Sequence, residues 1–254
     1  MADKSKIERV PTGIAGLDEM LSGGFVSGSS VLLRGAPGTG KTSLALQFLM
    51  HGARNDEPGV MISFEEFPQS IHRDAEALGW NLQELEQKQR VHLHFTSPQV
   101  LLDSLQSPNS ALSRLLMDSG IRRVALDSVT HFTRVTSDPV ELRSVYNMVI
   151  NALKREQVTA LLLGEDSRFE AQRFEQGKLS YIVDAIVLLR YVEIDSAVQR
   201  AVTVIKMRGS NHARDIRRYE ISRKNGIVVS GLFEGREGIL SGISHRTADP
   251  GTRQ

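Results

Sequence analysis

The chain has 254 residues, of which 40% are hydrophobic and 24% charged, a composition typical of a soluble globular protein with one large domain or at most two small ones. Because it contains no cysteine, disulfides and thiolate metal sites are excluded, and its formal net charge of +1 does not favour a protein built mainly to bind nucleic acid. The N-terminus lacks the apolar run of a signal peptide, and no window approaches the roughly 20 apolar residues that span a bilayer, so we expect a soluble, cytoplasmic protein without a membrane segment.

Short apolar segments alternate with amphipathic segments along the first two thirds of the chain. This alternation predicts helices at residues 41–53, 68–78 and 139–155, with a further helical stretch that ends near residue 120. It predicts strands at residues 30–35, 60–64, 91–95, 124–128 and 158–164. Strands separated by helices of this length indicate an α/β fold with a parallel sheet covered on both faces. Ligands bind to such sheets beyond the carboxyl ends of the strands.

The last third of the chain has a different pattern. Residues 185–207 read as two long strands around a polar turn near Asp195, and strands at 217–222 and 226–231 follow with no helix between them. We expect these strands to form an antiparallel extension on the edge of the sheet. The sequence shows no internal repeat, so we predict a single domain over residues 1–243 and a disordered tail over residues 244–254.

The segment "GAPGTGKT" (Gly35 to Thr42) matches the phosphate-loop pattern G-x-x-x-x-G-K-[ST], between a predicted strand and a predicted helix. Gly38 and Gly40 lack Cβ atoms, so backbone N–H groups can surround phosphate oxygens. Lys41 is placed to reach the β- and γ-phosphates and the Thr42 hydroxyl to bind Mg²⁺. A chance match is the alternative, which the strand–loop–helix context disfavours. The predicted ligands are therefore ATP and Mg²⁺, bound by Gly35, Pro37, Gly38, Thr39, Gly40, Lys41, Thr42 and Ser43.

A magnesium–nucleotide site also needs an acid on a neighbouring strand. In "RRVALDS" the carboxylate of Asp127 follows three apolar residues, where it would meet the phosphate loop. Taken alone, Asp127 could be an ordinary strand-end or helix-capping aspartate, but the phosphate loop favours the metal role. Glu165 and Asp166 also end an apolar strand and could instead sense the γ-phosphate.

Two adjacent carboxylates, Glu65 and Glu66, end the apolar strand in "GVMISFEEF". Hydrolysis of a phosphoanhydride needs a group that orients and deprotonates water, and a carboxylate beside the phosphate loop can do this. Successive side chains of a strand point to opposite faces, so one carboxylate should meet the nucleotide and the other a neighbouring group. Adjacent carboxylates also raise each other's proton affinity, which improves a base. The alternative is a solvated strand end.

The motifs above, together with "TGIAGLDEML", "LGWNL" and "VIKMRGSNH", resemble the family of KaiC, the ATPase of the cyanobacterial circadian clock, within the RecA-like superfamily. The resemblance runs from about residue 12 to residue 242, in the same order and spacing. KaiC carries two such domains in tandem, whereas this chain has one. The resemblance implies a RecA-like P-loop fold and a homohexameric ring with ATP between subunits.

The resemblance also implies roles for individual residues. Glu65 and Glu66 match the catalytic base, and Asp127 matches the magnesium carboxylate. The residues that match those reaching across the subunit interface to the neighbour's ATP are Lys206, Arg208, Ser210 and His212. A cation supplied in trans can increase the rate about 10³- to 10⁵-fold. The alternatives are a solvated basic end of a hairpin for "KMRG" and a loop histidine without a role for His212.

One departure from the family concerns phosphorylation. The second KaiC domain phosphorylates itself on adjacent Ser and Thr residues, and the matching segment "KLSYIVDAI" has Ser180 followed by Tyr181. We therefore predict an ATPase without a phosphorylation cycle, although Ser180 could accept phosphate. The predicted function is a ring ATPase that acts as a signalling switch on an unidentified protein partner. The alternatives are a DNA-handling RecA- or RadA-like ATPase, and an autokinase or protein kinase that uses the same site.

Overall fold

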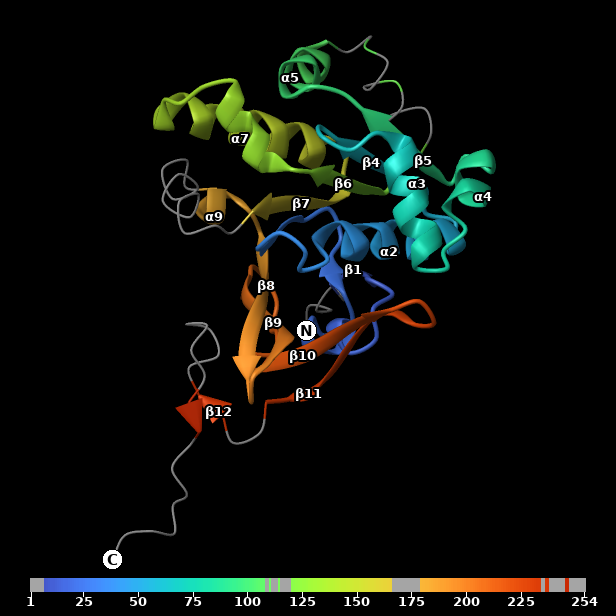
Figure 1. Cartoon of the computed structure of the whole chain (residues 1–254). Helices are drawn as coiled ribbons and strands as arrows, with labels where there is room; N and C mark the ends of the chain where they lie inside the picture. Colours follow the sequence, from blue (N-terminus) through green and yellow to red (C-terminus); the bar gives the residue numbers. More distant parts are fainter. Residues whose placement is uncertain are drawn as a thin grey trace, which may run out of the picture.

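The computed structural model describes residues 7–107, 110, 114, 120–165, 179–233, 236–237 and 245–246. Within them a nine-stranded sheet has the order β11-β10-β9-β8-β3-β7-β6-β4-β5 (Figure 1). The parallel part comprises β3 (Ser30–Gly35), β4 (Gly59–Ser63), β5 (Val91–Phe95), β6 (Arg123–Asp127), β7 (Thr159–Glu165) and β8 (Ala185–Ile194). The antiparallel part comprises β9 (Ala197–Met207), β10 (Ile216–Ser222) and β11 (Gly226–Leu232). The predicted α/β fold with its antiparallel extension is confirmed.

Helices cover both faces of the parallel strands. The helices on one face are α2 (Lys41–Arg54), α3 (Pro68–Ala77) and α4 (Leu82–Gln87), and those on the other are α5 (Pro98–Gln106), α7 (Pro139–Arg155) and the 3-10 helix η1 (Val129–Arg134) (Figure 1). The shorter elements are β1 (Arg9–Val10), α1 (Leu17–Met20), β2 (Phe25–Val26), α9 (Leu179–Ile182), β12 (Arg236–Glu237) and β13 (His245–Arg246). None of the helices in the described part of the chain has both the length and the apolar character needed to cross a bilayer.

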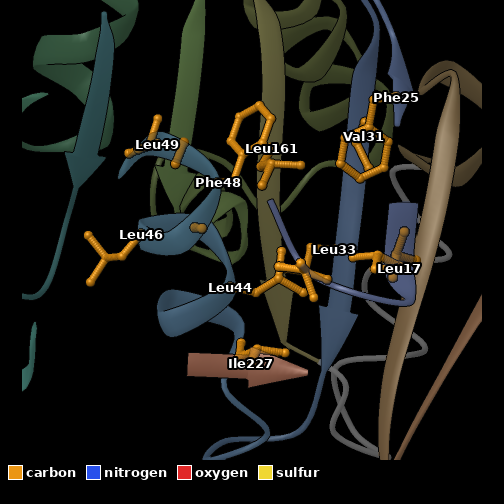
Figure 2. Packing of buried hydrophobic residues seen from close by; sticks show 14 of the residues in the cluster. Leu17, Phe25, Val31, Leu33, Leu44, Leu46, Phe48, Leu49, Leu161 and Ile227 are labelled. Atoms are coloured by element: carbon orange, nitrogen blue, oxygen red, sulfur yellow. The ribbon is translucent and has the colours of Figure 1, made fainter. Parts of the chain in front are cut away.

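Helix α2 is fixed to the sheet by apolar side chains three and four residues apart. Figure 2 shows Leu44 beside Leu33 of β3 and Phe48 beside Leu161 of β7, with Ile227 of β11 near the start of the helix. All are buried, and each buried leucine or phenylalanine contributes about 1.5–3 kcal/mol. This packing sets the position of the helix N-terminus, where the phosphate loop ends.

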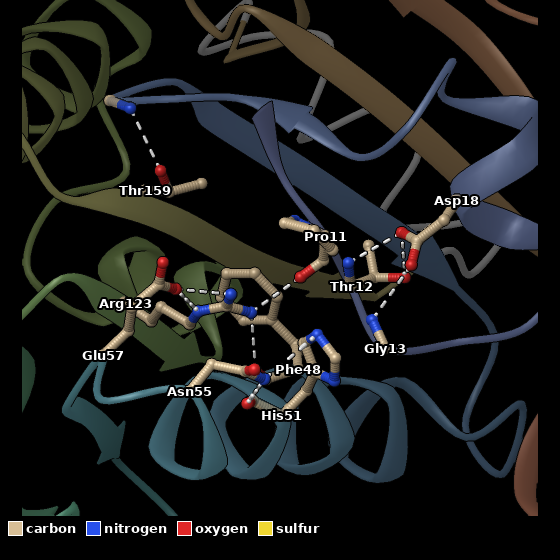
Figure 3. Close-up of polar contacts among 11 residues, drawn as sticks. Pro11, Thr12, Gly13, Asp18, Phe48, His51, Asn55, Glu57, Arg123 and Thr159 are labelled. Carbon is tan, nitrogen blue, oxygen red and sulfur yellow. Dashed lines mark hydrogen bonds and ion pairs between the residues drawn. The ribbon is translucent and has the colours of Figure 1, made fainter. Parts of the chain in front are cut away.

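A buried arginine ties the start of β6 to two other parts of the chain. The guanidinium of Arg123, which is 1% exposed, donates to Oε2 of Glu57 (2.7 Å) and to the carbonyls of Pro11 (2.7 Å) and Phe48 (3.0 Å) (Figure 3). Its Cζ atom also lies 4.6 Å from the centroid of the Phe48 ring. A buried charge is tolerated when it is paired and hydrogen-bonded, and Arg123 meets both conditions.

The predicted element boundaries agree closely with the structure for the main strands and helices. Helix α4, η1 and the short N-terminal elements were not predicted. Part of the helical stretch expected before residue 120 lies outside the described residues, as does most of the tail at 244–254. Within that tail, β13 pairs with β12 in a two-stranded antiparallel sheet.

Candidate functional site

The phosphate-loop segment forms a tight turn between β3 and α2. Gly38 and Gly40 have φ angles of 77° and 92°, in the left-handed region that favours glycine. A Cβ atom on Gly40 would lie 2.3 Å from Cδ1 of Ile221, so that side chain would have to move to admit it. Pro37 is exposed at the tip of the loop and Thr39 is buried. The loop therefore has the backbone shape that lets N–H groups converge on an anion at the start of a helix.

Lys41, the first residue of α2, lies along the inside of this loop. Its Nζ atom donates to the carbonyl oxygens of Gly35 (2.9 Å) and Ala36 (3.2 Å), and the residue is only 8% exposed. The ammonium group is thus held against the loop backbone, in the motif whose lysine is expected to meet β- and γ-phosphates. The predicted contact partners Gly35 and Ser43 flank the loop, at the end of β3 and in the first turn of α2.

The hydroxyl of Thr42 donates a 2.8 Å hydrogen bond to Oδ2 of Asp127. Asp127 ends β6, and β6 is separated from the strand of the phosphate loop by β7. Burial raises the pKa of the Asp127 carboxyl, and the bond from Thr42 and the charge of Lys41 partly oppose that shift. A hydroxyl and a carboxylate side by side are hard oxygen ligands of the kind Mg²⁺ uses together with phosphates and water. These residues fit a magnesium ion, and no cluster of three His, Cys, Asp or Glu side chains offers a rival metal site among the described residues.

The two glutamates after β4 have different surroundings. Glu65 lies 3.1 Å from Nε2 of His131 and accepts a 3.0 Å bond from Arg134, both in η1. Glu66 donates its backbone N–H to the Ser63 hydroxyl (3.0 Å). Burial raises the pKa of the Glu66 carboxyl, and the negative charge of Asp127 raises it further. The negative charge of Glu65 in turn raises the pKa of the Asp127 carboxyl, so both glutamates interact with Asp127, and Glu65 is in addition held by His131 and Arg134.

The predicted cations at the end of β9 lie at the other end of the sheet. Met207 pairs with Ala185, which pairs with Val31 near the start of β3, whereas the phosphate loop begins after Gly35 at the end of β3. Lys206 Nζ donates to the carbonyls of Ser180 (2.9 Å) and Val183 (2.7 Å). Burial lowers the pKa of Lys206, and the charge of the nearby Arg208 lowers it further.

Arg208 occupies the same end of the sheet as Lys206. It donates to the carbonyls of Tyr181 (2.5 Å) and Ile182 (3.5 Å) and lines a cleft of about 820 Å³ at the amino ends of the parallel strands. The hydroxyl of Ser210 accepts a 2.5 Å bond from Arg9, and His212 is partly buried in the segment that follows. Lys206, Arg208 and the segment with Ser210 and His212 therefore do not contact the phosphate loop of their own chain.

Comparison with known proteins shows the family of the chain. The family model for the KaiC ATPase matches residues 10–233. The chain belongs to the KaiC family. It is 33% identical over 251 residues to the circadian clock oscillator protein KaiC of Acaryochloris marina. The aligned residues make up 98% of this chain and 47% of that protein. The KaiC of Synechococcus elongatus is 34% identical over 249 residues, with 97% of this chain and 47% of that protein covered.

The chain spans about half the length of the curated KaiC relatives it matches. A solved structure of a KaiC-like protein from Pyrococcus horikoshii OT3 superposes with a TM-score of 0.77 at 28% identity, and covers 89% of this chain and 100% of that one. Membership of the KaiC family gives this chain an ATPase domain with the RecA-like fold.

The structure joins Asp127 to the helix of the phosphate loop through Thr42, places both glutamates near enough for their charges and that of Asp127 to interact, and leaves the "KMRGSNH" segment apart. Glu165, the alternative metal acid, ends β7, and its backbone N–H donates to Thr130 (3.1 Å); Asp166 lies outside the described residues. Sequence reasoning missed His131 and Arg134, although the segment "VTHFTR" directly follows the strand that carries Asp127. It also missed the hydrogen bond that the Tyr219 hydroxyl of β10 donates to the carbonyl of Thr39 in the phosphate loop, a contact that depends on the pairing of distant strands.

Proposed function

We propose that this chain binds ATP with Mg²⁺ and hydrolyses it. The observation that carries the proposal is the hydrogen bond from Thr42 to Asp127, next to a loop whose glycines have the conformation of a phosphate cradle. Lys41 would neutralise charge on the phosphates, and the oxygens of Thr42 and Asp127 would hold the metal ion. The magnesium ion supplies charge neutralisation of the phosphates when it is bound.

Glu66 is the residue we propose as the general base. It lies at the carboxyl end of β4, its pKa is raised by burial, and the charge of Asp127 favours its uptake of a proton. A carboxylate with raised proton affinity is a better acceptor of a proton from water. Glu65 then has a supporting role, because His131 and Arg134 already hold its carboxylate.

We further propose that the complete site forms between two copies of the chain. Lys206 and Arg208 lie toward the amino end of their own sheet, so they cannot complete the site at its carboxyl end within one copy. In a head-to-tail assembly they would face the neighbour's phosphates, and a heterologous contact of this kind forms a ring when the rotation between successive copies closes. A cytoplasmic homohexamer that switches the binding of a protein partner is the assembly we propose.

Two measurements test this proposal. Equilibrium dialysis with labelled ATP and Mg²⁺ should show binding by the wild type and loss of most binding in Lys41→Ala, because the ammonium group inside the loop is removed. The matched control is Lys88→Ala, whose ammonium pairs with Glu84 on the exposed side of α4. Mass measurement in solution should show an oligomer that depends on ATP. A wild-type chain that neither binds ATP nor releases phosphate would overturn the proposal.

A further inference from the structure

The antiparallel extension presents a row of three side chains to the phosphate loop of its own chain. Tyr191 of β8, Arg200 of β9 and Tyr219 of β10 are directly paired in register. Cross-strand partners in register share one face of a sheet, so these side chains lie on the same side. The guanidinium of Arg200 lies 5.7 Å from the centroid of the Tyr191 ring. A Cβ atom built on Gly38 would lie 2.9 Å from the Tyr191 hydroxyl, which places this face directly against the loop.

Tyr219 makes the most specific contact between the extension and the loop. Its hydroxyl donates a hydrogen bond to the backbone carbonyl of Thr39, and both residues are buried. Burial also raises the pKa of Tyr219, so the hydroxyl keeps its proton and remains a donor at any pH near neutrality. Within the loop, Thr39 is held further by its own side chain, which donates to the carbonyl of Ala36 (2.8 Å).

The contact with Tyr219 fixes the orientation of the peptide unit between Thr39 and Gly40. In a trans peptide the C=O and the following N–H point to opposite sides. The carbonyl of Thr39 is turned toward Tyr219 in the protein interior, so the N–H of Gly40 points away from Tyr219. If this peptide rotated, a carbonyl oxygen would face the anion in place of an N–H donor. That exchange would replace an attraction to phosphate by a repulsion.

We propose that the Tyr219 hydroxyl is a positioning group for nucleotide binding: by holding the Thr39 carbonyl it directs the Gly40 N–H toward the phosphates. This inference rests on the proposed function and adds a residue that lies outside the phosphate-loop motif by about 180 positions in sequence. The same strand also packs on the loop at Gly40, where Cδ1 of Ile221, two residues after Tyr219, would have to shift to admit a Cβ atom. The β10 strand acts as a rigid support behind the loop.

The test is Tyr219→Phe, which removes the hydroxyl and keeps the ring that fills the core. We expect the Kd for ATP and for ADP to rise about three- to tenfold, which is the change in affinity expected when one hydrogen bond is lost. KM should rise by the same factor, and kcat should change less than twofold. The matched control is Tyr146→Phe. Tyr146 is also buried, and its hydroxyl has no hydrogen-bond partner among the described residues, so this change should leave the Kd unaltered.

The outcomes separate this inference from the proposed function. If the wild type does not bind ATP, the proposed function fails. If the wild type binds ATP and Tyr219→Phe binds it with the same Kd, the positioning role of Tyr219 is wrong. A variant that melts at a lower temperature yet retains the wild-type Kd would show a purely structural hydroxyl and would also overturn the inference.

A second substitution keeps the test decisive if the phenylalanine variant does not fold. 3-Fluorotyrosine at position 219 retains the ring and the hydroxyl and makes the hydroxyl a stronger donor. We expect its Kd for ATP to equal or fall below that of the wild type. A Kd raised as far as expected for the phenylalanine variant would contradict a role for the hydroxyl as a hydrogen-bond donor.

Discussion

Thr42 and Asp127 are 85 positions apart in the sequence, and the hydroxyl of one donates to the carboxylate of the other at 2.8 Å. Thr42 is in the first turn of α2, whereas Asp127 ends the strand β6, two strands away from the phosphate-loop strand. The contact therefore depends on the order β3-β7-β6 in the sheet, which brings the carboxyl ends of β3 and β6 to one edge. A hydroxyl and a carboxylate at this edge are the chemical pair on which the magnesium prediction depends.

The first prediction concerns Asp127→Asn. We expect a fall in ATP turnover of about 10- to 100-fold at low Mg²⁺ concentration, because an amide oxygen is a weaker magnesium ligand than a carboxylate. The folded state should become more stable at the same time. Since burial raises the pKa of Asp127, its ionised form costs free energy in the folded chain at neutral pH, and the neutral amide avoids that cost. Phosphate release against Mg²⁺ concentration and thermal melting measure the two effects.

The control for Asp127 is Asp103→Asn on α5, where the carboxylate is exposed and accepts a bond from Gln99 (3.0 Å). We expect it to change neither turnover nor the dependence on Mg²⁺. An Asp127→Asn protein with wild-type turnover across the Mg²⁺ range would remove this residue from the metal site.

The second prediction separates the two glutamates. Glu66→Gln should lower kcat by about 10²- to 10⁴-fold while ATP binding persists, because the base is lost. Glu65→Gln should have a much smaller effect, since that carboxylate is engaged by His131 and Arg134. A large loss in Glu65→Gln with a mild one in Glu66→Gln would exchange the two roles. Single-turnover phosphate release with each variant distinguishes the cases.

Glu66 also predicts a dependence of rate on pH. A general base works in its ionised form, so kcat falls as pH decreases through the pKa of the base. Because burial and Asp127 raise the pKa of Glu66 above the ordinary value of 4.5, the acid limb of the kcat profile should lie above pH 4.5. The residual activity of Glu66→Gln should lack this limb. A wild-type profile that is flat down to pH 4.5 would argue against Glu66 as the base.

The third prediction concerns the stability provided by Arg123. A lysine cannot bond to Glu57, Pro11 and Phe48 together as the guanidinium does. We expect Arg123→Lys to lower the free energy of unfolding by about 2–4 kcal/mol, and Tm by about 5–10 °C. Arg155→Lys is the control: that side chain is exposed and should change stability by less than about 0.5 kcal/mol. Equal melting temperatures for the two variants would show that the buried network contributes little.

The parts of the fold that could be predicted are those with strong apolar periodicity. Strands such as β3 were recognised because a run of buried residues dominates their sequence, and helices such as α7 because buried apolar residues recur at helical spacing. Helix α4 has six residues, only one of them buried, and its start is fixed by the Asn81 side chain, which accepts from the Glu84 N–H. So short an element leaves too few apolar positions for a periodic pattern to emerge.

The candidate site shows the same division. The phosphate loop could be predicted because its chemistry is contained in eight consecutive residues, and Asp127 because it ends an apolar strand. The separate surroundings of Glu65 and Glu66 depend on η1, which packs beside them only in the folded chain. The support of Thr39 by Tyr219 depends on the pairing of β8, β9 and β10. Register between distant strands leaves no local signal in the sequence.

The fourth prediction tests whether the site is shared between copies. The Lys41→Ala variant lacks the cation of the phosphate loop, and the Arg208→Ala variant lacks the cation proposed to act on the neighbouring copy's phosphates. Each protein alone should therefore be nearly inactive. In a mixed ring about one quarter of the interfaces would combine an intact loop with an intact Arg208 from the neighbour. Mixing the two variants in equal amounts with ATP should therefore restore up to about a quarter of wild-type turnover.

Arg208 also donates to the carbonyls of Tyr181 and Ile182, so its loss could disturb the local structure. Arg208→Lys controls for this, because it keeps a cation on this segment while losing the bidentate geometry of the guanidinium. We expect it to retain more turnover than Arg208→Ala and an unchanged melting temperature. If mixed Lys41→Ala and Arg208→Ala proteins form hetero-oligomers, as seen by mass, yet recover no turnover, the loop and Arg208 do not complement each other across copies. The cation must then act elsewhere than at the neighbour's phosphates.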